Sequence, residues 1–115
     1  MNIINSIMDT PINTDKVAKV QALYEDSFPE FVQRMLSYME DVVFIDDDLR
    51  LLSYREVVNA SEELHVDFQT KCILPLIDCG DNDFISYGTD DGTWFLYNIV
   101  ENVKFKERES LGELL

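Results

Sequence analysis

The residues of this chain that could do chemistry are mainly aspartates, gathered in Asp46-Asp47-Asp48 and in the segment 78–83. Carboxylates bind calcium, but the second segment lacks the ordered spacing of a calcium loop and has Thr89 where that loop requires glutamate. Acid and base catalysis by paired carboxylates requires a cleft and a raised pKa, which turn residues rarely have. We therefore interpret both segments as turns with solvated carboxylates, and we expect no metal and no cofactor.

Nucleophilic chemistry has little support in the sequence. His65 is the only histidine and follows a predicted helix, where an imidazolium interacts favourably with the helix dipole. Cys72 and Cys79 lie at the two ends of a predicted strand, which would hold them about 20 Å apart, so we expect two free thiols. The glycines do not have the spacing of a phosphate-binding loop. The sequence therefore predicts a protein that is not an enzyme.

Helical patterns are concentrated in the first half of the chain. Apolar residues recur there at helical spacing, and Pro29 is suited to the first turn of a helix. Ser53 and Glu56 have the spacing of a capping box, with Leu52 and Val57 at the two positions of a hydrophobic staple. The predicted helices are 14–26, 29–39, 54–64 and a closing turn at 110–113.

Strand patterns dominate the second half. Short apolar runs separated by Gly, Asp and Asn predict antiparallel strands joined by tight turns. The predicted strands are 42–45, 49–52, 72–77, 83–87, 93–100 and, as a short edge piece, 103–105. This order predicts an α+β fold, an antiparallel sheet of about five strands with helices packed on one face. The 115 residues predict a single domain over 1–115, with 1–12 as a loose N-terminal extension.

Charge limits the possible partners. The chain has 23 acidic and 9 basic residues, a formal net charge of −14. Phosphate backbones and anionic lipids repel such a surface, so direct binding to nucleic acid or membranes is not expected. A basic protein is the natural partner, although the acidity can also serve solubility alone. No apolar run is long enough to span a membrane and no secretory signal is visible, so a cytoplasmic location is expected.

Four short motifs, in this order, resemble the SUKH superfamily of Smi/Knr-type regulators and bacterial immunity proteins. Phe28-Pro29-Glu30 resembles the family's helix entry, and Leu51-Leu52-Ser53-Tyr54-Arg55-Glu56-Val57 is similar to its leucine pair before a capped helix. The segment 73–84 is similar to its proline-containing strand and Gly/Asp turn, and 110–115 to its closing helix. The resemblance implies an α+β domain without enzymatic activity that binds another protein, in bacteria often a toxin.

These observations predict a cytoplasmic immunity protein that neutralises a toxin, such as a basic nuclease, by offering carboxylates to a cationic surface. The alternative is an acidic phage or prophage product that imitates the phosphate backbone of DNA to inhibit a DNA-binding or defence protein. For either function, the predicted contacts are turn carboxylates with two aromatic anchors. The carboxylates are Asp46, Asp47, Asp48, Asp81, Asp83, Asp90 and Asp91, and the anchors are Tyr87 and Trp94.

Overall fold

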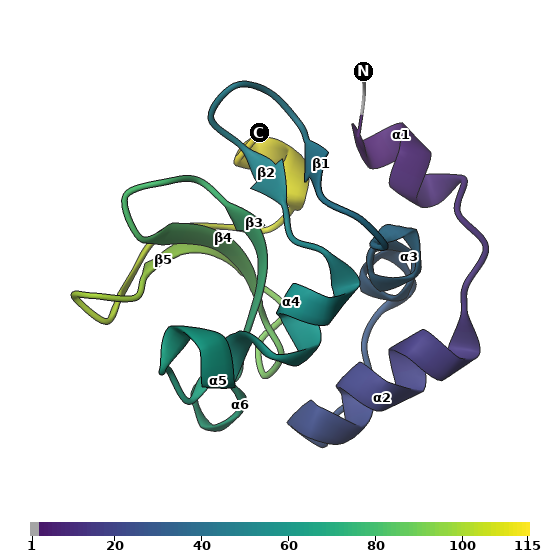
Figure 1. The fold of residues 1–115 in the computed structure, drawn as a ribbon, viewed down its shortest axis with the longest axis horizontal. Coiled ribbons are helices and arrows are strands. Elements are labelled where there is room, and N and C mark those ends of the chain that lie inside the picture. Colours follow the sequence, from purple (N-terminus) through teal and green to yellow (C-terminus); the bar gives the residue numbers. More distant parts are fainter. Residues whose placement is uncertain (1–2) are drawn as a thin grey trace.

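The sheet is an antiparallel meander of six strands whose spatial order is the same as their order in the sequence (Figure 1). The computed structural model describes residues 3–115. The α+β class is confirmed, with six strands instead of about five because the expected edge piece forms a full strand. The strands are β1 (Val43–Phe44), β2 (Arg50–Leu51), β3 (Ile73–Asp78), β4 (Asp83–Gly88), β5 (Trp94–Asn98) and β6 (Val103–Arg108).

Three helices precede the sheet, three connect β2 to β3, and a short 3-10 helix follows β6. They are α1 (Ile3–Met8), α2 (Thr14–Tyr24), α3 (Glu30–Tyr38), α4 (Tyr54–Val58), α5 (Ala60–Leu64), α6 (Phe68–Lys71) and η1 (Leu111–Glu113). Within the described part of the chain, none of them is long and apolar enough to cross a membrane.

The capping box at Ser53 is present, and it begins α4 as predicted. Ser53 Oγ accepts from the Glu56 N–H at 3.2 Å, and Glu56 Oε1 accepts from the Ser53 N–H at 3.0 Å. The single helix expected over 54–64 is instead two short helices that meet at Asn59. The Asn59 side chain donates to the Arg55 carbonyl at 2.9 Å, a local hydrogen bond of the kind that competes with a continuing helix.

Helix α6 was not predicted, because its four residues are too few for a periodic pattern. Asp67 caps it by accepting from the Thr70 N–H at 3.3 Å. Phe68 is fully buried, and its ring meets the ring of Tyr97 edge-on at 6.2 Å between centroids. Helix α6 therefore anchors the connection between β2 and β3 to the sheet.

The N-terminal segment is packed and is not the loose extension expected over 1–12. Residues 1 and 2 lie outside the described residues, but α1 follows directly and packs against α3. Ile3 is 4% exposed and Ile7 is 0% exposed. They are four residues apart and so lie on one face of the helix, which gives α1 an apolar side to bury.

Helices contact the sheet from both faces, whereas the sequence predicted one. Residues 94 and 97 of β5 differ by an odd number, so their side chains lie on opposite faces. Phe31 of α3 meets Trp94 at 6.0 Å, and Phe68 of α6 meets Tyr97. The physical reason is that β3 is apolar at consecutive positions, and all residues from Ile73 to Ile77 are buried. A strand of this kind requires cover on both sides.

The two edge strands of the sheet differ in length and charge. β1 has two residues. β6 has six, including Lys104, Lys106 and Arg108, and most of them are exposed. Its pairing with β5 shifts register, and Lys106 has a φ of 53°. β6 is therefore a bulged and basic edge.

Candidate functional site

Three acidic turns lie at the same end of the sheet. Strands β1, β3 and β5 run in the same direction in an antiparallel meander, so the turns that follow them share one end. Figure 1 shows them along one side of the molecule, from the loop between β1 and β2 at the top to the loop after β5 at the left. We call this surface the acidic end. Its carboxylates are Asp46, Asp47, Asp48, Asp81, Asp83 and Glu101.

Asp46 shapes the first acidic turn. Its Oδ1 accepts from the Asp48 N–H at 2.8 Å and from the Leu49 N–H at 3.0 Å, as in an Asx turn. Asp47 and Asp48 are exposed, and their carboxylates make no described hydrogen bond. The turn therefore uses one carboxylate for structure and presents two to solvent.

The second acidic turn has an unusual backbone. Gly80, Asp81 and Asn82 all have positive φ, at 80°, 52° and 67°. Asn and Asp tolerate this conformation better than other residues that carry a Cβ, and Gly has no Cβ to hinder it. The Gly80 N–H donates to Asp78 Oδ1 at 2.9 Å. Asp81 is left exposed at the tip, while Asp83 is half-buried at the start of β4.

Asn98 connects the second and third acidic turns. Its Nδ2 donates to Asp83 Oδ1 at 2.9 Å. Its Oδ1 accepts from the N–H groups of Val100 and Glu101 at 3.0 and 2.9 Å. One side chain thus holds the two turns in a fixed relation.

Charged groups at both of the first two acidic turns act on the Cys79 thiol. Burial raises its pKa to about 11, and the charges of Asp78, Asp83 and Asp46 act in the same direction. Asp46 acts on Cys79 across the gap between the turns, consistent with their shared end. A thiol with this pKa stays protonated at neutral pH and is a poor nucleophile. Both cysteines are free in the structure.

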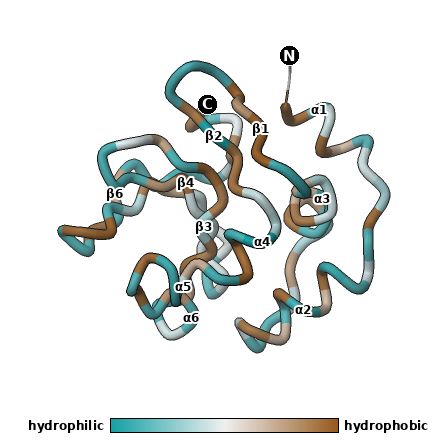
Figure 2. The backbone as a smooth tube through the Cα atoms, in the orientation of Figure 1, coloured by the Kyte–Doolittle hydropathy of each residue, from teal (hydrophilic) through white to brown (hydrophobic). Residues whose placement is uncertain are grey.

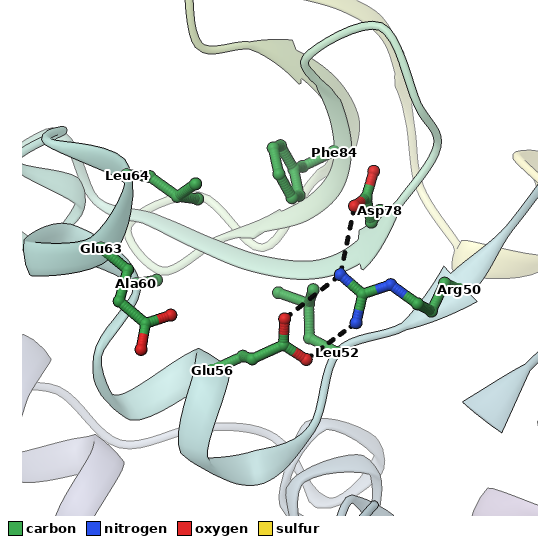
Figure 3. Close-up of a pocket in the computed structure, with 8 residues that line it drawn as sticks. All are labelled: Arg50, Leu52, Glu56, Ala60, Glu63, Leu64, Asp78 and Phe84. Carbon is green, nitrogen blue, oxygen red and sulfur yellow. Dashed lines mark hydrogen bonds and ion pairs between the residues drawn. The ribbon is translucent and has the colours of Figure 1, made fainter. Parts of the chain in front are cut away.

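Arg50 lies beside the acidic end, but two carboxylates already occupy its guanidinium (Figure 3). Nη1 and Nη2 contact the two oxygens of Glu56 at 2.8 and 3.2 Å, and Nη2 contacts Asp78 at 3.2 Å. Hydrogen bonding to Glu56 is the main cause that raises the pKa of Arg50. Burial alone would raise the pKa of Glu56, but hydrogen bonds from Arg50 and Ser53 outweigh it and the pKa is lowered.

The structure brings five of the predicted contact residues together and separates four. Asp46, Asp47, Asp48, Asp81 and Asp83 belong to the acidic end. Asp90 and Asp91 lie in the turn between β4 and β5, at the opposite end of the sheet. Asp91 Oδ1 accepts from the N–H and the hydroxyl of Thr93 at 3.0 and 2.7 Å, which lowers its pKa and gives it a structural role.

The two predicted aromatic anchors are core residues. Tyr87 is 7% exposed and Trp94 is 5% exposed, and their rings lie 5.2 Å apart. A buried ring cannot meet a partner without local unfolding, so the structure contradicts the anchor role for both. They are buried because α3 covers the face of the sheet on which both rings lie. Trp94 is packed there against Phe31 of α3.

Exposed apolar residues that the sequence reasoning missed flank the acidic end instead. Phe44 is 67% exposed on β1, two residues before Asp46. Val100 is 71% exposed in the third turn, which forms a brown tip at the left of Figure 2. The three turns (45–49, 79–82 and 99–102) contain no lysine, arginine or histidine. The surface therefore combines negative charge with two apolar side chains.

Residues that could hold a metal do not converge in the described structure. No group of three or more His, Cys, Asp or Glu side chains within residues 3–115 has a geometry suited to a metal ion. His65 lies past α5 with a φ of 56°, where its N–H donates to the Ser61 carbonyl. This placement gives His65 a capping role.

Comparison of the chain with family models, curated proteins and solved structures found no match. The resemblance to the SUKH superfamily therefore stays a prediction from the motifs.

Proposed function

We propose that this protein is a non-enzymatic binding module that engages a cationic protein through its acidic end. One observation carries the proposal: three turns and the start of β4 place six carboxylates at one end of the sheet, and the three turns contain no basic residue. Such a surface attracts a positively charged partner and accelerates the encounter. Phe44 and Val100 add apolar area of the kind that stabilises a complex after the encounter.

Within this class, the function we propose is that of a cytoplasmic immunity protein that neutralises a toxin. A basic nuclease is a suitable target, because its cationic substrate-binding surface is complementary to the acidic end. Covering that surface would block the toxin without any chemistry by the immunity protein. The motif resemblance to the SUKH superfamily supports this reading.

The row of carboxylates also supports a second candidate, a phage-type inhibitor that imitates the phosphate backbone of DNA. Its target would be a DNA-binding or defence protein with a phosphate-binding surface. Duplex DNA must then compete with this protein for the target. A target that duplex DNA does not displace leaves only the first candidate.

Binding of decalysine by isothermal titration calorimetry tests the role of the acidic end. The variant Asp47→Asn/Asp48→Asn/Asp81→Asn removes three carboxylates that make no described hydrogen bond. At 0.1 M NaCl we expect it to weaken binding about tenfold, since exposed charge pairs contribute about 0.2–1 kcal/mol each. The wild-type affinity should fall as NaCl rises, because salt screens exposed charges.

The matched control is Asp9→Asn/Asp90→Asn/Glu109→Gln, which changes the net charge equally at exposed positions outside the acidic end. We expect it to weaken decalysine binding by less than about twofold, because charges beyond a Debye length of about 10 Å at 0.1 M salt are largely screened. Equal losses in the two triple variants would show that overall charge, and not the acidic end, attracts the peptide.

A further inference from the structure

A small pocket opens beside the acidic end, between strands β2 to β4 and helices α4 and α5 (Figure 3). Its volume is about 80 Å³. Four apolar side chains line it, namely Leu52, Ala60, Leu64 and Phe84. The remaining lining residues are charged: Arg50, Glu56, Glu63 and Asp78.

The pocket is continuous with the acidic end through the strand pairing. Arg50 pairs with Asp78 across β2 and β3, and Asp78 lies two residues before Gly80 in the second acidic turn. On the other side, Arg50 pairs with Phe44 across β1 and β2. The exposed Phe44 ring therefore belongs to the strand next to the pocket, and a partner on the acidic end would reach both.

The pocket has more negative than positive charge. It contains one guanidinium and three carboxylates, an excess of two negative charges. Glu56 and Asp78 share Arg50, whereas Glu63 forms no ion pair with the described residues. Figure 3 shows Glu63 on the side of the pocket opposite to Arg50. A cation between Glu56 and Glu63 would reduce this excess from two negative charges to one.

The volume limits what can enter. Sites for small-molecule ligands measure about 300–1,000 Å³. The volume of this pocket, about 80 Å³, is well below that range. This space suits the end of one side chain. A lysine ammonium is compact and follows a narrow aliphatic stem, whereas the guanidinium of arginine is a wide planar group.

We propose that this pocket receives a lysine side chain of the protein that binds the acidic end. The methylene groups contact Leu52, Ala60, Leu64 and Phe84, and the ammonium lies between Glu56 and Glu63. The inference rests on the proposed function, because it specifies one contact of the cationic partner.

Methyl NMR spectroscopy of the intact chain tests the pocket with four blocked pentapeptides, Gly-Gly-X-Gly-Gly. X is lysine, ornithine with one methylene fewer, arginine, or norleucine without charge. We expect the lysine peptide to shift the methyl signals of Ala60 and Leu64 in a saturable manner. The ornithine and arginine peptides should bind at least twofold more weakly, and the norleucine peptide should cause no saturable shift.

Two variants on α5 provide the matched comparison, because Glu62 and Glu63 are neighbours and both are exposed. Glu63→Gln should weaken binding of the lysine peptide about threefold, within the range for an exposed charge pair. Glu62 does not line the pocket, so Glu62→Gln should weaken binding of the lysine peptide less than 1.5-fold. Equal effects of the two variants, or lysine binding without shifts at Ala60 and Leu64, would overturn the pocket assignment.

The two proposals fail in different ways. If decalysine binds the acidic end while the pocket methyl signals stay unchanged, the pocket assignment is wrong and the proposed function stands. If decalysine does not bind at low salt, the proposed function is wrong, and the pocket assignment falls with it.

Discussion

Single side chains determine how the acidic end is arranged. Asn98 donates to Asp83 and accepts from two backbone N–H groups of the third turn, so it sets the relation between two turns. The sequence did not identify this role of Asn98, because its partner Asp83 lies at the start of β4, which only the sheet pairing brings near. The aspartates themselves were predicted, since aspartate clusters between apolar runs are typical of turns.

Glu56 combines two roles at the residue scale, as the capping partner of Ser53 and as the main partner of Arg50. Its pKa is lower in the folded protein than the usual value. The charged form therefore stabilises the folded state above the unfolded pKa of about 4.3, and this contribution is lost as the pH falls through the folded pKa.

We predict that Glu56→Gln lowers the free energy of unfolding at pH 7 by about 1 to 2 kcal/mol, since it replaces charged hydrogen bonds by neutral ones. Urea denaturation at pH 7 and pH 3 measures the difference, which should be smaller at pH 3 because Glu56 is then more protonated. Glu62→Gln, on the exposed side of α5, should change stability by less than about 0.5 kcal/mol at both pH values. A difference for Glu56→Gln that is the same at pH 3 and pH 7 would contradict the assigned role of its charge.

At the scale of elements, the sequence predicted the parts that carry local signals. The capping box at Ser53 identified the start of α4, and the turn residues separated the strands correctly. It did not predict α6, the break at Asn59 or the packing of α1. Helix α6 and the packing of α1 depend on contacts between distant segments, such as Phe68 against Tyr97, which no local pattern contains. The break at Asn59 accompanies the local hydrogen bond from its side chain to the Arg55 carbonyl.

Helix α1 provides a test of that packing. Ile7→Ala should lower the free energy of unfolding by about 2 to 4 kcal/mol, because a fully buried aliphatic side chain leaves a cavity when it is truncated. Met8→Ala is the matched control on the same helix, since Met8 is 56% exposed, and it should cost less than about 0.5 kcal/mol. Equal small effects of the two substitutions in urea denaturation would mean that α1 does not contribute to the folded core.

At the scale of the whole molecule, charge is distributed unevenly. The acidic end carries six carboxylates, while three of the nine basic residues lie on β6. The net charge of −14 predicted a cationic partner but could not show which surface meets it. The surface that we propose for this partner follows from the direction of the strands, because a meander places alternate turns at the same end.

The bulged, basic strand β6 has a consequence for solubility. An edge strand exposes unpaired backbone groups that can recruit another chain, and lysine side chains and bulges are known protections against this. We predict that Lys104→Thr/Arg108→Thr increases light scattering of a concentrated solution on mild heating. The control Lys19→Thr/Lys71→Thr removes the same charge from helices α2 and α6, and it should not increase light scattering.

If the two double variants scatter light equally, the protection against aggregation comes from net charge alone. In the native chain, the opposite edge, β1, ends after two residues and offers little backbone to a second sheet. Short length at one border of the sheet, and positive charge with a bulge at the other, thus limit the backbone on which a fibril could grow.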